Sequence, residues 1–274
     1  VAAWVWGGGW VMELGNLLGD YPGVIDYAGG TAVHINAGAA ALALAVVLGR
    51  RVVFSKGAHK PHNVPLVLLG AALLWFGWFG FNAGAEFLAE GMPGVGLIVV
   101  NTLGATSAAI LGWMIIEKLK DGKATAVGAA SGAVTGLVAI TPACANLTPG
   151  FALLLGVVAG VISALAVDLK FKFGYDDSLD VVGIHLVAGL VGTLYLGFFA
   201  IDTGLFTGGD FGQLTVQAIA AVGIMVYSFV VALILGFAIE KTLGFRVTSE
   251  DEVAGIDTAV HGEEGYQLEE DARV

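Results

Sequence analysis

Seven apolar runs of about 17–25 residues, none containing lysine or arginine, make up most of this sequence. They cover residues 27–49, 64–85, 95–116, 124–141, 151–167, 181–201 and 214–239. Backbone amides inside a bilayer have no water to bond, so runs of this length predict transmembrane helices rather than strands. The composition agrees, because 57% of the residues are hydrophobic and only 13% are charged. We therefore expect an all-α, polytopic membrane helix bundle with about seven transmembrane helices.

The positively charged residues predict how the chain is oriented. All 12 Lys and Arg residues lie in alternate connections or after the last run, within residues 50–60, 118–123, 170–172 and 241–273. Lysine and arginine are enriched in short cytoplasmic loops, so the C-terminus is expected in the cytoplasm and the protein in the cell membrane. We expect a transmembrane domain over 1–243 and a cytoplasmic tail over 244–274.

Two histidines, His34 and His185, lie inside separate apolar runs. A group that can carry a proton is costly in hydrocarbon, so such residues usually face the bundle interior or a polar path. We expect both histidines to line a path for a small polar or protonatable solute. A membrane redox protein with these histidines as axial haem ligands is an alternative of another class.

Asp26 and Asp180 stand at the starts of two of these runs, each ahead of one of the histidines. The simplest interpretation of both carboxylates is N-capping, which satisfies unpaired backbone N–H groups and complements the positive helix end. The likeness between the two segments indicates an internal duplication, which many transporters carry. Asp26, on the outer side, is also placed to help hold a cation at an entrance.

Aromatic side chains are expected at the same outer level as Asp26. Trp6 precedes the first complete run, and Phe81 lies near the outer end of the second. Aromatic residues are common at membrane interfaces, but their ring faces also attract small cations by up to about 2 kcal/mol when desolvated. Trp6 and Phe81 therefore predict a vestibule that selects small cations.

Several motifs resemble those of the ammonium transporter family, the Amt/MEP branch of the Amt/Rh superfamily. The motifs are Trp6-Gly-Gly-Gly, Asp26-Tyr-Ala-Gly-Gly-Thr-Ala-Val-His34, Trp78-Phe-Gly-Phe81-Asn82-Ala-Gly, Thr141-Pro-Ala-Cys144, Asp180-Val-Val-Gly-Ile-His185 and Gly244-Phe-Arg-Val. The resemblance covers essentially the whole chain. It implies that the chain corresponds to the last seven helices of an eleven-span fold and lacks roughly the first four. We expect such a piece to be inactive alone.

The resemblance also implies roles for individual residues. His34 and His185 would be the paired pore histidines, Phe81 one ring of the external gate, and Trp6 part of an external recruitment site that Asp26 supports. The remaining candidates, expected to be structural or supporting, are Asn82, Asp180 and Ala85.

The activity implied by the resemblance is transport and not an enzymatic reaction. Ammonium would be recruited outside, deprotonated near the gate and conducted as ammonia past the two histidines. Ala85 stands where the family has a serine, and Leu186 stands where a small residue usually follows the histidine. These departures leave open an ammonium sensor that transports little. The resemblance further implies a homotrimer and a PII-type regulatory protein at the cytoplasmic face. No nucleic-acid partner and no cofactor are expected.

Overall fold

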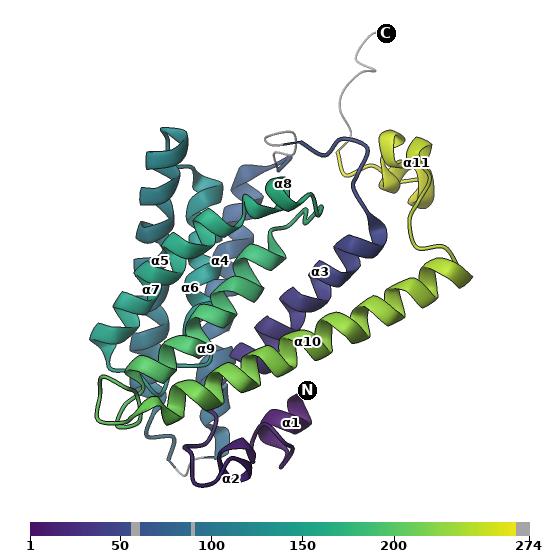
Figure 1. The fold of residues 1–274 in the computed structure, drawn as a ribbon. Coiled ribbons are helices and arrows are strands. Elements are labelled where there is room, and N and C mark those ends of the chain that lie inside the picture. Colours follow the sequence, from purple (N-terminus) through teal and green to yellow (C-terminus); the bar gives the residue numbers. More distant parts are fainter. Residues whose placement is uncertain (56–60, 89–90, 267–274) are drawn as a thin grey trace.

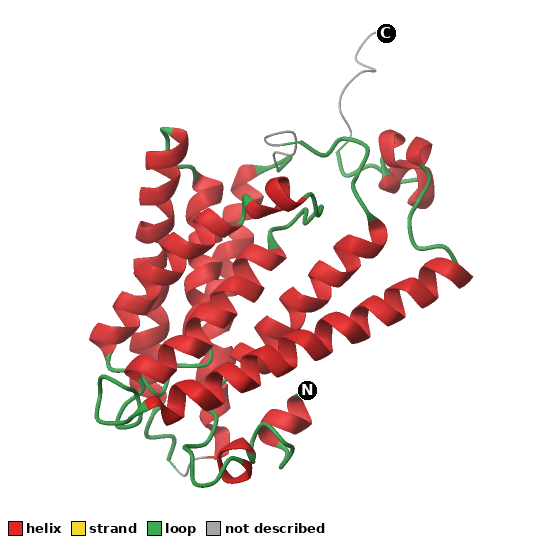
Figure 2. Ribbon diagram, in the orientation of Figure 1, coloured by secondary structure: helices red, strands yellow, loops and turns green. Residues whose placement is uncertain are grey.

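The computed structural model describes residues 1–266 except 56–60 and 89–90, and these residues form a helical bundle without strands (Figure 2). Within these described residues, six helical stretches are long and apolar enough to cross a membrane. They are Gly30–Leu48, Val64–Glu86, Val95–Asp121, Pro149–Phe173, Val182–Phe199 and Phe211–Thr242. They coincide with six of the seven apolar runs, so the prediction of an all-helical membrane bundle is confirmed.

The seventh run, 124–141, forms the shorter apolar helix α6 (Ala126–Ile140). Its 15 residues fall short of the roughly 20 that span a bilayer. The regular helix ends before Pro142, which has no backbone N–H and cannot continue the hydrogen-bond ladder. The chain then makes tighter turns, in which Ala143 N donates to Ile140 O. Helix length alone therefore supports six spans and leaves the predicted count of seven open.

Two of the six stretches begin with a π-helical turn. Gly30–Ile35 leads into α3 (Asn36–Leu48), and Val182–Leu186 leads into α9 (Val187–Phe199). The other long helices are α4 (Val64–Ala83), α5 (Val95–Asp121), α7 (Pro149–Ala166) and α10 (Phe211–Thr242). The short helices are α1 (Ala2–Trp6), α2 (Leu14–Leu17), α8 (Leu169–Phe173) and α11 (Ser249–Ala254), with a 3-10 turn at Gly84–Leu88 and a π-helical turn at Asp257–His261.

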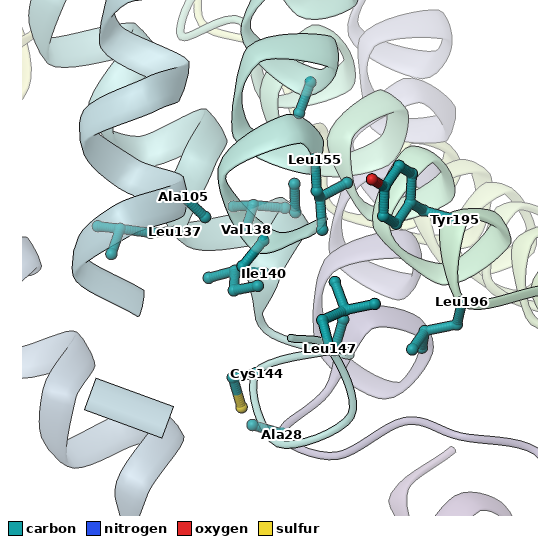
Figure 3. Packing of buried hydrophobic residues seen from close by; sticks show 14 of the residues in the cluster. Ala28, Ala105, Leu137, Val138, Ile140, Cys144, Leu147, Leu155, Tyr195 and Leu196 are labelled. Carbon is teal, nitrogen blue, oxygen red and sulfur yellow. The ribbon is translucent and has the colours of Figure 1, made fainter. Parts of the chain in front are cut away.

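The helices pack into two groups that share α9 (Figure 1). In the first, α5 packs against α6 and α7, and the largest buried cluster lies among them and α9 (Figure 3). In the second, α10 runs along α3 and α9, and its buried cluster includes residues of both π-helical turns. Ala28 and Ala188, which lie next to these turns, belong to the first cluster. The two turns therefore lie where the two groups meet.

Glycines let helix backbones touch inside the bundle. A Cβ added to Gly192 of α9 would lie 2.0 Å from the carbonyl oxygen of Ala139 in α6. A Cβ on Gly156 of α7 would lie 2.2 Å from the carbonyl oxygen of Ala105 in α5. Close backbone approach at small residues is typical of membrane bundles, where lipid supplies no hydrophobic drive between helices. Gly192 and Gly156 thus pack helices against one another.

The C-terminal segment folds back onto the end of α3, and α11 lies at the opposite end of the bundle from α1 and α2 (Figure 1). Arg246 donates to Leu48 O at 2.9 Å and pairs with Glu252 at 2.6 Å. Glu252 also accepts a hydrogen bond from Val52 N at 2.6 Å. The described part of the predicted tail, 244–266, is therefore tied to the loop that follows the first span.

Candidate functional site

The structure brings His34 and His185 together at the junction of the two helix groups. Each lies in a π-helical turn, and their Nδ1 atoms are 3.1 Å apart. This is a hydrogen-bonding distance, so one ring donates a proton that the other accepts. His34 is 3% exposed. The pair can share one proton while the remaining ring nitrogens stay available to other groups.

Aromatic residues of α4 form a wall beside His34. The ring of Trp78 stacks on the His34 imidazole with centroids 5.4 Å apart and planes inclined by 15°. The Phe81 ring lies 6.2 Å from the same imidazole and 5.4 Å from Trp78. The Nε2 atom of His34 is buried, and no described residue bonds to it. A polar solute next to this wall would find a free ring nitrogen in apolar surroundings.

Asp26 caps the first π-helical turn, as the sequence predicts. Its carboxylate accepts hydrogen bonds from the backbone N–H groups of Gly29 at 3.1 Å, Thr31 at 2.9 Å and Ala32 at 3.0 Å. It also accepts from Gly30 N and from the Thr31 hydroxyl. Asp26 is buried, and these donors surround both of its oxygens. Its direct structural effect is to fix the start of the helix that carries His34.

The two predicted vestibule rings take different partners. The indole Nε1 of Trp6 donates to the backbone carbonyl of Asp26 at 2.9 Å, which places Trp6 beside the cap. Phe81 instead faces His34. Trp6 and Phe81 are 46% and 43% exposed, and within the described residues their rings make no contact with each other. The structure thus connects both rings to the histidine region but not to one another.

The prediction that Asp180 caps the second turn is wrong, because Asp177 does so. The Asp177 carboxylate accepts from Val181 N at 3.0 Å and from Val182 N at 2.7 Å. Asp180 adopts a positive φ of 58° and pairs with Lys170 at 2.6 Å. An N-cap must reach the N–H groups of the first turn, which Asp177 does from the preceding loop. The signal was in the spacing, since Asp177 precedes His185 by eight residues (185 − 177), as Asp26 precedes His34 (34 − 26).

Threonines that the sequence analysis missed connect the aromatic wall to the core. Trp78 Nε1 donates to the Thr141 hydroxyl at 2.8 Å, and that hydroxyl lies 3.3 Å from Asn82 Oδ1. Asn82 Nδ2 in turn donates to the Thr102 hydroxyl at 3.0 Å. Thr141, Asn82 and Thr102, which continue this series of hydrogen bonds from Trp78, are all fully buried. The sequence did offer a signal for these contacts, because polar residues inside apolar runs need hydrogen-bond partners. Thr141, the first residue of its motif, is one of them.

The two departures from the family motifs lie in different parts of the bundle. Ala85 belongs to the 3-10 turn that ends α4 and packs against the first buried cluster. Leu186 is buried in the second cluster and contacts Gly38 so closely that a Cβ there would lie 2.4 Å from Leu186 N. Leu186 is therefore part of the packing between α3 and the second π-helical turn.

Comparisons with known proteins agree on one family. The model of the Ammonium Transporter Family matches residues 1–266. An ammonium transporter of Mycobacterium tuberculosis is 52% identical over 281 residues, which cover 98% of this chain and 58% of that protein. A solved structure named Sensor Amt Protein superposes with a TM-score of 0.83 at 30% identity, covering 94% of this chain and 65% of that one. Candida albicans Mep2 gives 0.79 at 33% identity, covering 90% and 56%. The chain thus spans about three-fifths of the length of such relatives, and it belongs to the ammonium transporter family.

Proposed function

We propose that this chain forms the conducting part of a membrane transporter that takes up ammonium. The solute crosses as ammonia, along a path lined on one side by His34 and His185 and on the other by the aromatic wall of α4. The observation that carries the proposal is the 3.1 Å contact between two imidazoles in the interior of an apolar bundle. Family membership and the similarity to Mep2 support ammonium as the solute.

The chemistry follows from the cost of charge in hydrocarbon. An ion in the bilayer interior costs several kcal/mol, whereas ammonia is neutral and small. Ammonium that loses one proton before it enters the path beside the histidines therefore becomes ammonia, which the apolar interior admits. The imidazole pair offers ammonia both a donor and an acceptor, and it offers the proton a hydrogen-bonded route. Potassium has no proton to lose and stays excluded.

Recruitment belongs to the outer end of the path in this proposal. Trp6 and Phe81 supply ring faces for ammonium, and Asp26 holds Trp6 through its carbonyl group. Asn82 supports the position of Trp78 through the Thr141 hydroxyl. Asp180 stabilises the loop before the second π-helical turn through its ion pair with Lys170. Ala85 lacks the hydroxyl group that a serine would offer to ammonium.

The finer architecture is also proposed from the resemblance. α6 together with the buried turns after it would serve as the seventh span, within the last seven helices of an eleven-span fold. Residues 1–243 would form the membrane domain and 244–274 a cytoplasmic tail, of which 267–274 lie outside the described residues. A homotrimer in the cell membrane, with a PII-type protein at the cytoplasmic face, completes the proposal.

The test is transport by the full-length gene product in proteoliposomes. We would measure the ammonium-evoked current and the uptake of radiolabelled methylammonium, with potassium as the control ion. Saturable transport is expected, and His185→Ala should abolish it or admit potassium. His62→Ala is the matched control, because His62 contacts Tyr266 outside the candidate path. Unchanged transport and unchanged potassium exclusion in both His185→Ala and His34→Ala would overturn the proposal.

A sensor is the second candidate, favoured by the similarity to Sensor Amt Protein and by Ala85. Ammonium binding without current or uptake would identify it. The haem alternative fits the geometry poorly. Axial haem ligands lie on opposite sides of the iron, so their nitrogens are separated by twice a metal–nitrogen bond of about 2 Å, and the two Nδ1 atoms are closer than that.

A further inference from the structure

Two glutamines, Gln213 and Gln217, are fully buried in the mostly apolar helix α10. Gln217 pairs with the backbone of Ile25 on both sides of its amide, since Oε1 accepts from Ile25 N and Nε2 donates to Ile25 O, each at 2.8 Å. This pattern imitates the pairing of a neighbouring β-strand. A buried amide is costly unless its hydrogen bonds are made, and here they are made to one backbone segment.

The second glutamine and the neighbouring helix extend this attachment. Gln213 Nε2 donates to Gly23 O at 3.0 Å and to Gln217 Oε1 at 3.2 Å. Gln217 Nε2 also donates to Thr193 O of α9 at 3.1 Å. The segment from Gly23 to Ile25 is thereby fastened to α10, and Gln217 of α10 is bonded in turn to α9.

The same segment is held on its other side by the turn after α6. Tyr27 N donates to Pro142 O at 3.1 Å, and Ala28 N donates to Thr141 O at 3.2 Å. Asp26 lies between these two attachments. Its carboxylate caps the helix that carries His34, and its carbonyl group receives the Trp6 indole.

We propose that Gln217 is a positioning residue for the external recruitment site, acting through the backbone of Ile25 on Asp26 and on Trp6. The inference rests on the proposed function and names a residue outside the conduction path. Because Ile25 and Asp26 share a peptide bond, a shift of Ile25 moves the Asp26 carbonyl that holds the indole. The last membrane helix thus sets the geometry at the outer entrance.

The test separates recruitment from conduction. Gln217→Leu removes both hydrogen bonds to Ile25, together with those to Thr193 and Gln213. In the full-length protein it should raise the apparent KM for ammonium about tenfold, the effect of the two neutral hydrogen bonds lost at Ile25, and change the maximal rate much less. Gln213→Leu loses the hydrogen bonds to Gly23 and to the Gln217 amide but keeps those between Gln217 and Ile25. A smaller rise in the apparent KM is therefore expected. Ser228→Ala is the control, because Ser228 is buried in the same helix and its hydroxyl bonds to no described residue.

A double variant distinguishes positioning from general loosening. If Gln217 acts through Trp6, then Gln217→Leu combined with Trp6→Leu should have the KM of Trp6→Leu alone. An unchanged KM in Gln217→Leu, or multiplied effects in the double variant, would overturn the inference. If Gln217→Leu does not fold, the same comparison is made with Gln213→Leu and its double variant. Absence of any ammonium transport by the unmodified protein would instead count against the proposed function.

Discussion

The Nδ1 atoms of His34 and His185 lie 3.1 Å apart although 151 positions separate the residues in the chain. Each histidine sits in a π-helical turn, and an aspartate eight residues earlier caps each turn. The bundle therefore presents its two intramembrane histidines from matching local structures. Two imidazoles in this contact compete for one shared proton, so they act as a unit.

Removal of both histidines should cost little more than removal of one. Transport by His34→Ala/His185→Ala is expected within about twofold of the weaker single variant, because either change already breaks the shared hydrogen bond. Methylammonium uptake by the three variants, compared at equal protein in the vesicles, measures this. Losses that multiply would show that each histidine acts independently.

Asp177 should matter more than Asp180. Asp177→Ala removes the cap of the turn that carries His185 and should destabilise the protein by about 1 kcal/mol, with reduced transport. Asp180→Ala breaks a partly exposed ion pair with Lys170, which is worth about 0–1 kcal/mol. Thermal unfolding in detergent together with uptake rates provides the comparison. A larger loss in Asp180→Ala would contradict this assignment of the cap.

Ala85→Ser should strengthen recruitment. The substitution returns a hydroxyl acceptor to the turn that ends α4, next to the aromatic wall, while it adds only one atom. The apparent KM for ammonium is expected to fall about two- to fivefold, within the range of one neutral hydrogen bond. Ala83→Ser, two residues earlier at the end of α4, is the control. No difference between the two variants would remove Ala85 from the recruitment site.

Helix contacts at glycine should be intolerant of a methyl group. Gly192→Ala would place its Cβ 2.0 Å from Ala139 O, so α6 and α9 must separate at a cost of about 1–3 kcal/mol. Gly70→Ala on α4 meets no atom within 4 Å and should be neutral or stabilising, since alanine favours helix. Melting temperatures of both variants test the contrast, and equal stability would mean that the helices adjust freely.

The tail attachment should weaken in acid. The Arg246 guanidinium and the Val52 N–H lower the pKa of Glu252 below its ordinary value. A carboxyl group whose pKa is lowered by folding stabilises the attachment above its ordinary pKa, and this contribution is lost as pH falls through the lowered pKa. Proteolysis of the tail should therefore accelerate at that pH, and Arg246→Ala should accelerate it already at neutral pH. Cleavage that is independent of both changes would contradict the attachment.

Much of the architecture could be predicted from residue type and spacing. Apolar runs without lysine or arginine predict helices because hydrocarbon offers the backbone no other partners, and six runs match spans in the structure. His34 and His185 were identifiable because ionisable groups are expensive in hydrocarbon, and Asp26 because it stands at the start of a run, where a carboxylate caps a helix. The end of α6 at Ile140 lies one residue before the predicted end of its run at 141, because Pro142 cannot continue a helix.

The linear sequence decides which segments enter the bilayer, since hydropathy and backbone bonding are local properties of each run. Which groups meet inside it depends on how the helices pack. The 3.1 Å histidine contact and the attachment of Ile25 to Gln217 each join atoms that spacing alone does not bring together. Those contacts exist because glycine faces allow close approach and because a buried polar group is costly when it has no hydrogen-bond partner.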